Sequence, residues 1–264
     1  MGKFIAAMDH SGGSTGEVLE RYGQAYTEED KMDKVHEMRL RMVNSPDFNS
    51  DNIWAAILYK DTVERGMVPI LKEKGIQAYL KVDSGTNEDG TMKDFDLDEM
   101  LDFALDNGCV GTKMRSIVTT PAMGSTILHQ QFKLAEKIHA RGLMPIIEPE
   151  VPINHSNKRG MELGLFQMFE RVLDVYPGKC ILKLTLPETS GLYSAFATHF
   201  NVEKIVGLSG GYSTKEACRR LSLNEGMSAS FSRALSENLS ASQSDEEFDK
   251  TLSNNIKDIT EAST

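Results

Sequence analysis

The lysine at position 183 has the surroundings of a nucleophilic amine. Lys183 lies in the apolar run 180–187, and its neighbours along the chain are Leu182 and Leu184. A lysine must lose its proton before it can attack a carbonyl carbon, and the ordinary lysine pKa of about 10.4 prevents this at neutral pH. Burial among leucines, together with a second ammonium group such as that of Lys113, favours the neutral amine. We therefore expect Lys183 to form an imine, which stabilises the carbanion left when an adjacent carbon–carbon bond breaks.

Two glutamates are spaced for the proton transfers that imine chemistry needs. Glu148 and Glu150 lie two residues apart in the run 145–150, Pro-Ile-Ile-Glu-Pro-Glu, and side chains two apart on a strand share a face. Dehydration of a carbinolamine and cleavage of a carbon–carbon bond both move protons. We therefore expect these two carboxyl groups to act as general acid and base.

Two glycine-rich turns could hold phosphate groups. The run 208–213, Leu-Ser-Gly-Gly-Tyr-Ser, leads into an expected helix near Thr214, so its backbone N–H groups and the helix dipole are expected to bind an anion. Arg233 could add a bidentate contact. A second pair of glycines lies in the run 11–14, Ser-Gly-Gly-Ser, and also precedes a helix. A single Gly-Gly pair is more often a simple turn, but two such turns predict a substrate with a phosphate at each end.

Eight short apolar runs that favour β-structure recur along the chain, and stretches with helical spacing separate them. The runs cover residues 3–9, 53–59, 77–83, 110–115, 144–150, 180–185, 204–209 and 227–232. Helical spacing is clearest in residues 131–139, in residues 161–175 and after Ser244. Strands that alternate with helices predict parallel βα units, and eight units predict an α/β fold of the closed (β/α)₈ type, a TIM barrel.

The predicted barrel is one domain over residues 1–264, with a helical C-terminal segment at 236–264. An open doubly wound sheet is the alternative, but residues 9–14 replace the glycine-rich fingerprint expected after its first strand. In a barrel the functional side chains come from the carboxyl ends of several strands. Here those ends carry Asp9, Lys81, Asp83, Lys113, Arg115, Glu148, Glu150, Lys183, Ser209 and Arg233.

The parity of each strand decides which of these side chains face inward. Leu182, Leu184 and Leu186 share one face and are expected to pack on the helices, which leaves Lys183 and Thr185 facing the barrel interior. A lone lysine at a strand end is usually a surface residue, and structural ion-pair networks exist. Buried charges are costly unless they are paired, so this many opposite charges at one end favour a functional site.

Composition excludes several classes of protein. The formal net charge of −10 argues against a nucleic-acid-binding surface, and no apolar stretch reaches the length of a membrane span. The first residues show no signal-peptide pattern, so we expect a cytoplasmic location. The 3 cysteines and 6 histidines lack disulfide or metal-ligand spacing. The sequence thus predicts no metal, no organic cofactor, and neither a nucleic acid nor a membrane as partner.

At these residues the chain resembles the class I fructose-bisphosphate aldolases, and the short bacterial form more than the longer animal one. The resemblance runs from about Gly2 to Ser263. It is carried by Lys81-Val-Asp83, Gly111-Thr-Lys-Met-Arg115, Pro145-Ile-Ile-Glu-Pro-Glu150, Leu182-Lys-Leu184, Leu208-Ser-Gly-Gly-Tyr-Ser213 and Ser230-Phe-Ser-Arg-Ala-Leu235. It implies a (β/α)₈ barrel that cleaves fructose 1,6-bisphosphate to dihydroxyacetone phosphate and glyceraldehyde 3-phosphate. The reaction is reversible, needs no metal, and belongs to glycolysis and gluconeogenesis.

The resemblance also implies a role for each site residue. Lys183 forms the Schiff base, Glu148 is the principal proton-transfer residue and Glu150 assists it. Lys113 helps to form the carbinolamine, and Asp9 orients the lysine and the hydroxyl group at the bond that is cleaved. The substrate-binding residues are Lys81 for the hydroxyl groups, Ser209, Gly210 and Arg233 for one phosphate, Ser11, Ser14 and Arg115 for the other, and either Arg39 or Arg41 as a further phosphate contact.

Two other functions stay open at this stage, as does assembly into a homo-oligomer. A Schiff-base aldolase for tagatose 1,6-bisphosphate or another phosphosugar would use the same lysine and glutamates. A non-catalytic phosphosugar-binding barrel would keep the phosphate turns, but it would not need an imine-forming amine at Lys183.

Overall fold

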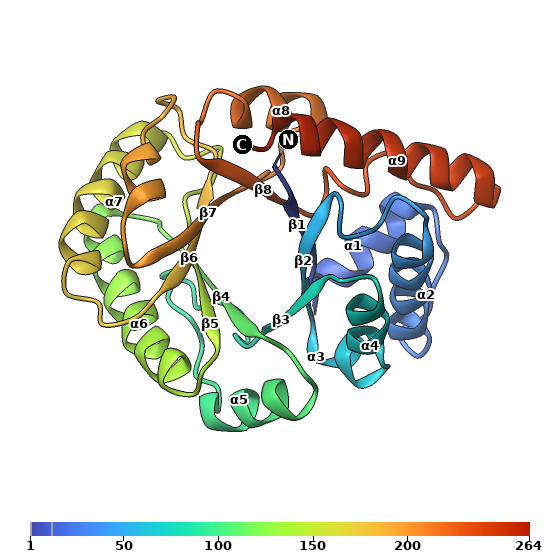
Figure 1. The fold of residues 1–264 in the computed structure, drawn as a ribbon, viewed down its shortest axis with the longest axis horizontal. Helices are drawn as coiled ribbons and strands as arrows, with labels where there is room; N and C mark the ends of the chain where they lie inside the picture. The colour runs from blue at the N-terminus through green and yellow to red at the C-terminus, as the bar shows by residue number, and fades with distance from the viewer. Residues whose placement is uncertain (1, 12) are drawn as a thin grey trace.

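Eight parallel strands close into a barrel in the computed structural model, which describes residues 2–11 and 13–264 (Figure 1). Each strand pairs with the next along the chain, and β8 pairs with β1. The strands are β1 (Phe4–Met8), β2 (Ile53–Leu58), β3 (Gln77–Lys81), β4 (Gly111–Ile117), β5 (Met144–Glu150), β6 (Cys180–Thr185), β7 (Val202–Leu208) and β8 (Met227–Phe231). All eight expected strands are therefore present, and the predicted closed barrel is confirmed.

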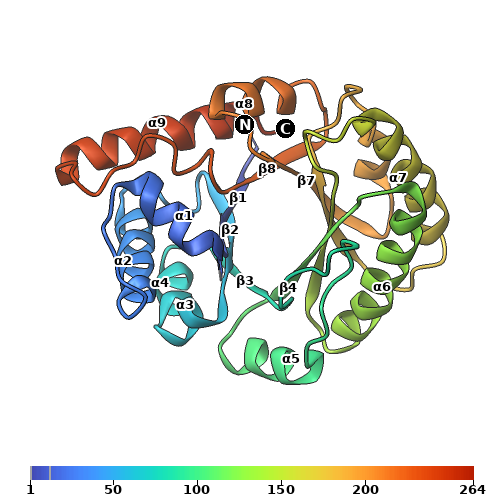
Figure 2. The same ribbon diagram turned by 180° about the vertical axis from the view of Figure 1, so that it is seen from behind.

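Helices cover the outside of the barrel in both views (Figures 1 and 2). They are α1 (Gly13–Tyr22), α2 (Lys31–Asn44), α3 (Lys60–Glu64), α4 (Met67–Glu73), α5 (Leu97–Asp106), α6 (Pro121–Ala140), α7 (Lys158–Leu173), α8 (Thr214–Leu221) and α9 (Asp245–Ala262), with a 3₁₀ turn η1 (Ser194–Thr198) before β7. The two chain ends lie close together, and the Gly2 amide donates to the Ser263 carbonyl at 3.0 Å. Over the described ranges, no helix is both long and apolar enough to cross a membrane.

Strand parity divides the core into two layers. Leu182, Leu184 and Leu186 are buried in the outer layer between strands and helices, as their alternation predicts. The inner layer fills the lower part of the barrel with Ile5, Ala7, Ala55, Ile57, Tyr79, Ile146, Ile181 and Val206. Side chains two residues further along these strands share the inner face. Asp9, Lys81, Glu148 and Lys183 therefore stand above an apolar floor, at the carboxyl end of the barrel.

The C-terminal helix begins later than expected, at Asp245 and not at residue 236. The helix α9 begins at Asp245, where Ser244 and Glu247 form a reciprocal capping box, and residues 236–244 form turns and bends. Asn238 has a φ of 62°, which a helix cannot contain. The helix expected at 131–139 is longer than predicted, because it begins at Pro121 under a Thr120 cap.

Candidate active site

A cavity of about 500 Å³ opens at the carboxyl ends of the strands. Every residue that the sequence singled out as catalytic or substrate-binding lines it, apart from the alternatives Arg39 and Arg41. The lining includes Asp9, Ser11, Ser14, Lys81, Lys113, Arg115, Glu148, Glu150, Lys183, Ser209, Gly210 and Arg233. Such a volume is typical of small-molecule sites. The barrel thus brings together groups that lie far apart in the chain.

A network of four charged groups occupies the bottom of the cavity. Its members are Asp9, Lys113, Glu148 and Lys183. The Lys113 Nζ lies 2.5 Å from Asp9 Oδ2 and 3.2 Å from Glu148 Oε2. The other carboxylate oxygen of Glu148, Oε1, lies 3.2 Å from Lys183 Nζ. Glu148 therefore bridges two amines, and it can exchange a proton with Lys183 without any rearrangement of heavy atoms.

Neighbouring charges determine the ionisation of Asp9 and Lys113 in this network. Burial by itself would raise the pKa of Asp9, but the ammonium groups of Lys113 and Lys183 hold it far below its usual range. Burial would likewise lower the pKa of Lys113, but Asp9 and Glu148 raise it well above its usual range. Asp9 is therefore an anion and Lys113 a cation at any physiological pH.

Two further ion pairs accompany these four groups at the carboxyl end of the barrel. The Arg115 Nε lies 2.5 Å from Glu150 Oε2, and the Lys81 Nζ lies 2.8 Å from Asp83 Oδ1. Asp83 also accepts the backbone N–H of Arg115 at 3.2 Å, which joins the ends of β3 and β4. Glu150 outweighs the effect of burial on Arg115 and raises its pKa above the usual range. The carboxylate of Glu150 is thus balanced by a guanidinium and does not contact Lys183.

The turn after β7 requires glycine at two successive positions. Gly210 has a φ of 60° and Gly211 a φ of 114°, which side chains other than hydrogen rarely tolerate. A Cβ at Gly210 would also lie 2.6 Å from the methyl carbon Cγ2 of Ile153. Arg233 lies beside the turn, with its NH1 3.2 Å from the position of a Cβ on Gly211. A glycine turn and a guanidinium group thus lie together at this edge, and both can contribute to an anion site.

At the N-terminus of α8, groups of the protein itself already bond two of the backbone amides. The Thr214 amide donates to Glu237 Oε2 at 2.9 Å, and the Ser213 hydroxyl caps the amide of Glu216. A carboxylate of the protein itself therefore occupies the positive end of this helix. The amides of Thr214 and Glu216 are therefore engaged within the protein.

The second expected phosphate turn leads into α1. The Ser14 hydroxyl donates to the Ser11 carbonyl at 2.9 Å and accepts the Ser11 amide at 3.2 Å, so each residue holds the other at the cavity wall. Gly12 lies outside the described residues. Arg115, expected to contact the same phosphate, also lines the cavity.

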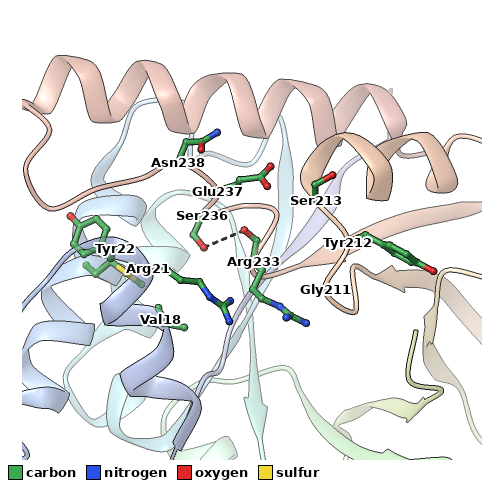
Figure 3. A pocket seen from close by; sticks show the side chains of 11 residues that line it. Val18, Arg21, Tyr22, Gly211, Tyr212, Ser213, Arg233, Ser236, Glu237 and Asn238 are labelled. Atoms are coloured by element: carbon green, nitrogen blue, oxygen red, sulfur yellow. Dashed lines mark hydrogen bonds between the residues drawn. The ribbon is translucent and has the colours of Figure 1, made fainter. Parts of the chain in front are cut away.

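Sequence reasoning missed the arginine of α1. Arg21 lines the cavity and, together with Arg233, also borders an adjoining side cavity of about 480 Å³ (Figure 3). In Figure 3 both guanidinium groups extend toward the same space, and their mutual repulsion contributes, after burial, to a lowered pKa of Arg233. Ser14, Val18 and Arg21 are spaced by four and three residues and line the cavity together. Helical spacing therefore contained the signal for Arg21.

Neither of the two alternative phosphate-binding arginines lines the active-site cavity. Arg39 is buried and donates to the His10 carbonyl at 2.8 Å and to Thr62 Oγ1 at 2.5 Å. Arg41 donates to the Tyr22 hydroxyl at 3.1 Å and contacts Asp245 at the start of α9. Both arginines therefore hold structural elements together.

His10 is more than the polar loop residue that the sequence suggests. Its ring lines the cavity, and its Nε2 lies 2.9 Å from Ser232 Oγ on the segment after β8. Burial lowers the pKa of His10 to about 4, Asp9 opposes this shift and Arg39 adds to it. The imidazole is therefore neutral at physiological pH, and it bonds the ends of β1 and β8 together.

The fold and the site are those of a TIM-barrel enzyme with a buried lysine in its active site. That lysine, Lys183, lies beside the carboxylate of Glu148, and arginines line the cavity around them. Two relatives named fructose-bisphosphate aldolase class 1 resemble the chain over nearly its whole length. That of Clostridium acetobutylicum is 44% identical, covering 98% of this chain and 95% of its own. That of Synechocystis sp. is 46% identical, covering 98% and 93%. The chain belongs to the family of class 1 fructose-bisphosphate aldolases, which are carbon–carbon lyases.

Solved structures show the same fold at low sequence identity. Fructose-bisphosphate aldolase from Plasmodium falciparum, in complex with TRAP and a small-molecule inhibitor, is 18% identical with a TM-score of 0.76, covering 98% of this chain and 90% of its own. An archaeal fructose-1,6-bisphosphate aldolase, whose catalytic lysine is covalently bound to the carbinolamine intermediate of the substrate, is 11% identical with a TM-score of 0.56, covering 96% and 93%. No protein-family model matches the chain.

Proposed function

We propose that this protein cleaves fructose 1,6-bisphosphate reversibly to dihydroxyacetone phosphate and glyceraldehyde 3-phosphate, through a Schiff base on Lys183. The observation that carries the proposal is the distance of 3.2 Å between Lys183 Nζ and Glu148 Oε1 at the bottom of the cavity. The substrate named for the two bacterial relatives supports the choice of fructose bisphosphate. A covalently bound carbinolamine on the lysine of an archaeal enzyme with this fold supports the mechanism.

Formation of the imine uses the lysine and the glutamate that contacts it. Glu148 takes a proton from Lys183, and the free amine attacks the carbonyl carbon C2 of the open-chain ketose. Lys113, which contacts the other oxygen of Glu148 at 3.2 Å, stabilises the oxygen anion that develops on C2. The oxygen anion takes a proton from the newly bonded nitrogen, which gives the neutral carbinolamine. Glu148 then gives its proton to the departing hydroxyl group, so that water leaves and an iminium group remains on Lys183.

Cleavage follows because the iminium group accepts the electron pair of the C3–C4 bond. Asp9 is ionised, so it accepts a hydrogen bond from the C4 hydroxyl and orients it. The hydroxyl proton passes to the Glu148 carboxylate as the bond breaks, and glyceraldehyde 3-phosphate departs. The enamine left on Lys183 takes up a proton at C3, and water then hydrolyses the imine to release dihydroxyacetone phosphate.

The remaining groups hold the substrate in place for this chemistry. Lys81 contacts the hydroxyl groups of the sugar, and Glu150 assists Glu148 in proton transfer. The two phosphates lie at opposite sides of the cavity, one at Ser209, Gly210 and Arg233, the other at Ser11, Ser14 and Arg115. The cytoplasmic location, independence of metals and cofactors, and assembly into a homo-oligomer all stay predictions.

Trapping the imine tests the proposal directly. Borohydride added with dihydroxyacetone phosphate should reduce the imine and inactivate the enzyme irreversibly. Peptide mass mapping should then place the added group on Lys183, because Asp9 and Glu148 hold Lys113 as a cation and Lys81 is engaged in an ion pair with Asp83. The same preparation should cleave fructose 1,6-bisphosphate before treatment. Modification of any other lysine, or unchanged activity after treatment, would count against the mechanism.

Arg21 should contribute to substrate binding without taking part in the chemistry. We expect Arg21→Ala to raise the KM for fructose 1,6-bisphosphate about 5- to 20-fold and to leave kcat nearly unchanged. A charge-assisted hydrogen bond contributes about 1.5–3 kcal/mol, and the half-exposed position of Arg21 reduces that value. Steady-state kinetics check this, with Arg41→Ala as the matched control because Arg41 does not line the cavity. An unchanged KM in Arg21→Ala would show that Arg21 does not contribute to substrate binding.

A further inference from the structure

Helix α6 carries a glutamine whose side chain is bonded to the backbone of the glutamate in the active site. Gln131 is completely buried. Its Oε1 accepts the backbone N–H of Glu148 at 2.9 Å, and its Nε2 donates to the Glu148 carbonyl oxygen at 3.2 Å. The same Nε2 also donates to the Ser116 hydroxyl on β4 at 2.9 Å. One side chain thus fixes the peptide groups on both sides of the Glu148 Cα and ties them to the neighbouring strand.

The strand needs this support because regular pairing ends there on one side. The pairs between β5 and β6 are Ile146 with Ile181 and Ile147 with Leu182, so Glu148 lies just beyond the last of them. Pro149 follows, and proline has no backbone N–H to donate. β4 still pairs with β5 here, with Arg115 opposite Glu148, and beyond the last pair with β6 the side-chain amide of Gln131 supplies the hydrogen bonds to the Glu148 peptide groups.

The position of the Glu148 backbone decides whether its carboxylate reaches both amines. Its two oxygens lie 3.2 Å from Lys183 Nζ and 3.2 Å from Lys113 Nζ. A rotation of the peptide groups around Glu148 would move the carboxylate away from at least one of them. A displacement of about 1 Å at a reacting group can lower a rate about 10²-fold.

We propose that Gln131 is a positioning residue for the reaction, acting through Glu148. It does not touch the substrate, and it does not line the cavity. It sets the place of the carboxylate that exchanges protons with Lys183. This inference rests on the proposed function, in which Glu148 is the principal proton-transfer residue.

The preceding residue of the same helix offers a matched control. The Gln130 Oε1 accepts the backbone N–H of Met92 at 3.1 Å, and its Nε2 donates to the Met92 carbonyl oxygen at 3.3 Å. The bonding pattern is the same as at Glu148, but Met92 belongs to the loop after β3 and does not line the cavity. Replacing either glutamine by methionine keeps a side chain of similar length and removes the hydrogen bonds.

Steady-state kinetics and thermal unfolding of the two variants separate positioning from stability. We expect Gln131→Met to lower kcat about 10- to 100-fold with KM within about twofold of the wild type, because the phosphate-binding residues stay in place. Gln130→Met should keep kcat within about twofold, whatever its melting temperature. Wild-type kcat in folded Gln131→Met would overturn the inference. Failure of the wild-type enzyme to cleave fructose 1,6-bisphosphate would instead refute the proposed function.

A second variant distinguishes positioning by its pH dependence, and it also serves if the methionine variant does not fold. In Gln131→Glu the protonated carboxyl group can still accept from the Glu148 amide and donate to its carbonyl. The ionised form loses the donor and adds a negative charge beside the active site, and burial raises the pKa of such a carboxyl group. We expect the kcat of Gln131→Glu relative to wild type to rise at least about fivefold as the pH falls from 8 to 6. A ratio that does not change with pH would overturn the inference.

Discussion

Replacement of Lys183 by methionine is expected to lower kcat for cleavage of fructose 1,6-bisphosphate by at least about 10⁴-fold, because no other amine can form the imine. Lys113 and Lys81 also face inward, but each lies within 2.8 Å of a carboxylate oxygen and is engaged in an ion pair. Binding of dihydroxyacetone phosphate should persist, since the turn at residues 209–211 and Arg233 are unchanged. Single-turnover kinetics measure the chemical step, and calorimetric titration measures the binding.

Methionine has nearly the length of lysine and suits an apolar wall, so Lys183→Met should fold. Glu148 keeps Lys113 as a partner at 3.2 Å, which avoids a buried carboxylate without a counter-charge. Lys179→Met is the control, because Lys179 lies just before the same strand in a half-exposed pair with Glu203. Such pairs contribute about 0–1 kcal/mol, so its kcat should match the wild type. Turnover by Lys183→Met above about one per cent of wild type would contradict the imine mechanism.

The inward direction of the site residues follows from local rules that a sequence contains. Strand parity alone places Lys183 inward and its flanking leucines outward, and the structure has both on those sides. The order of eight βα units then determines that strands from all parts of the chain end at one rim. Local pattern plus topology was therefore sufficient to bring Asp9, Glu148 and Lys183 into one cavity.

Contacts between distant segments account for what the sequence did not predict. Glu237 reaches the amide of Thr214 from the segment before α9, and nothing in the run 208–213 indicates that a carboxylate will occupy the helix terminus. Gln131 reaches Glu148 across 17 positions of the chain, and a glutamine in a helix is ordinarily a solvent-exposed residue. Both depend on how segments distant in the chain pack against one another, and hydrophobic periodicity does not encode that.

The two glutamates of β5 should differ sharply when each is replaced by glutamine. We expect Glu148→Gln to lower kcat about 10³-fold and Glu150→Gln only about 10-fold, within the range typical of general acid–base residues. Glu148 contacts Lys183, and its amide replacement can neither take the lysine proton nor return it to the departing hydroxyl group. The Glu150 carboxylate is already balanced by Arg115 at 2.5 Å, so its loss mainly releases that guanidinium.

Each replacement keeps the size of the side chain, so the comparison isolates proton transfer from packing. The rate of borohydride trapping reports imine formation, and it should fall in Glu148→Gln and stay near the wild-type rate in Glu150→Gln. Glu150→Gln is thus the matched control, on the same strand face and two residues away. A larger loss in Glu150→Gln than in Glu148→Gln would make Glu150 the principal proton-transfer residue. The bridge between Lys113 and Lys183 would then serve to hold the lysine in place, and proton exchange would run through a substrate hydroxyl group instead.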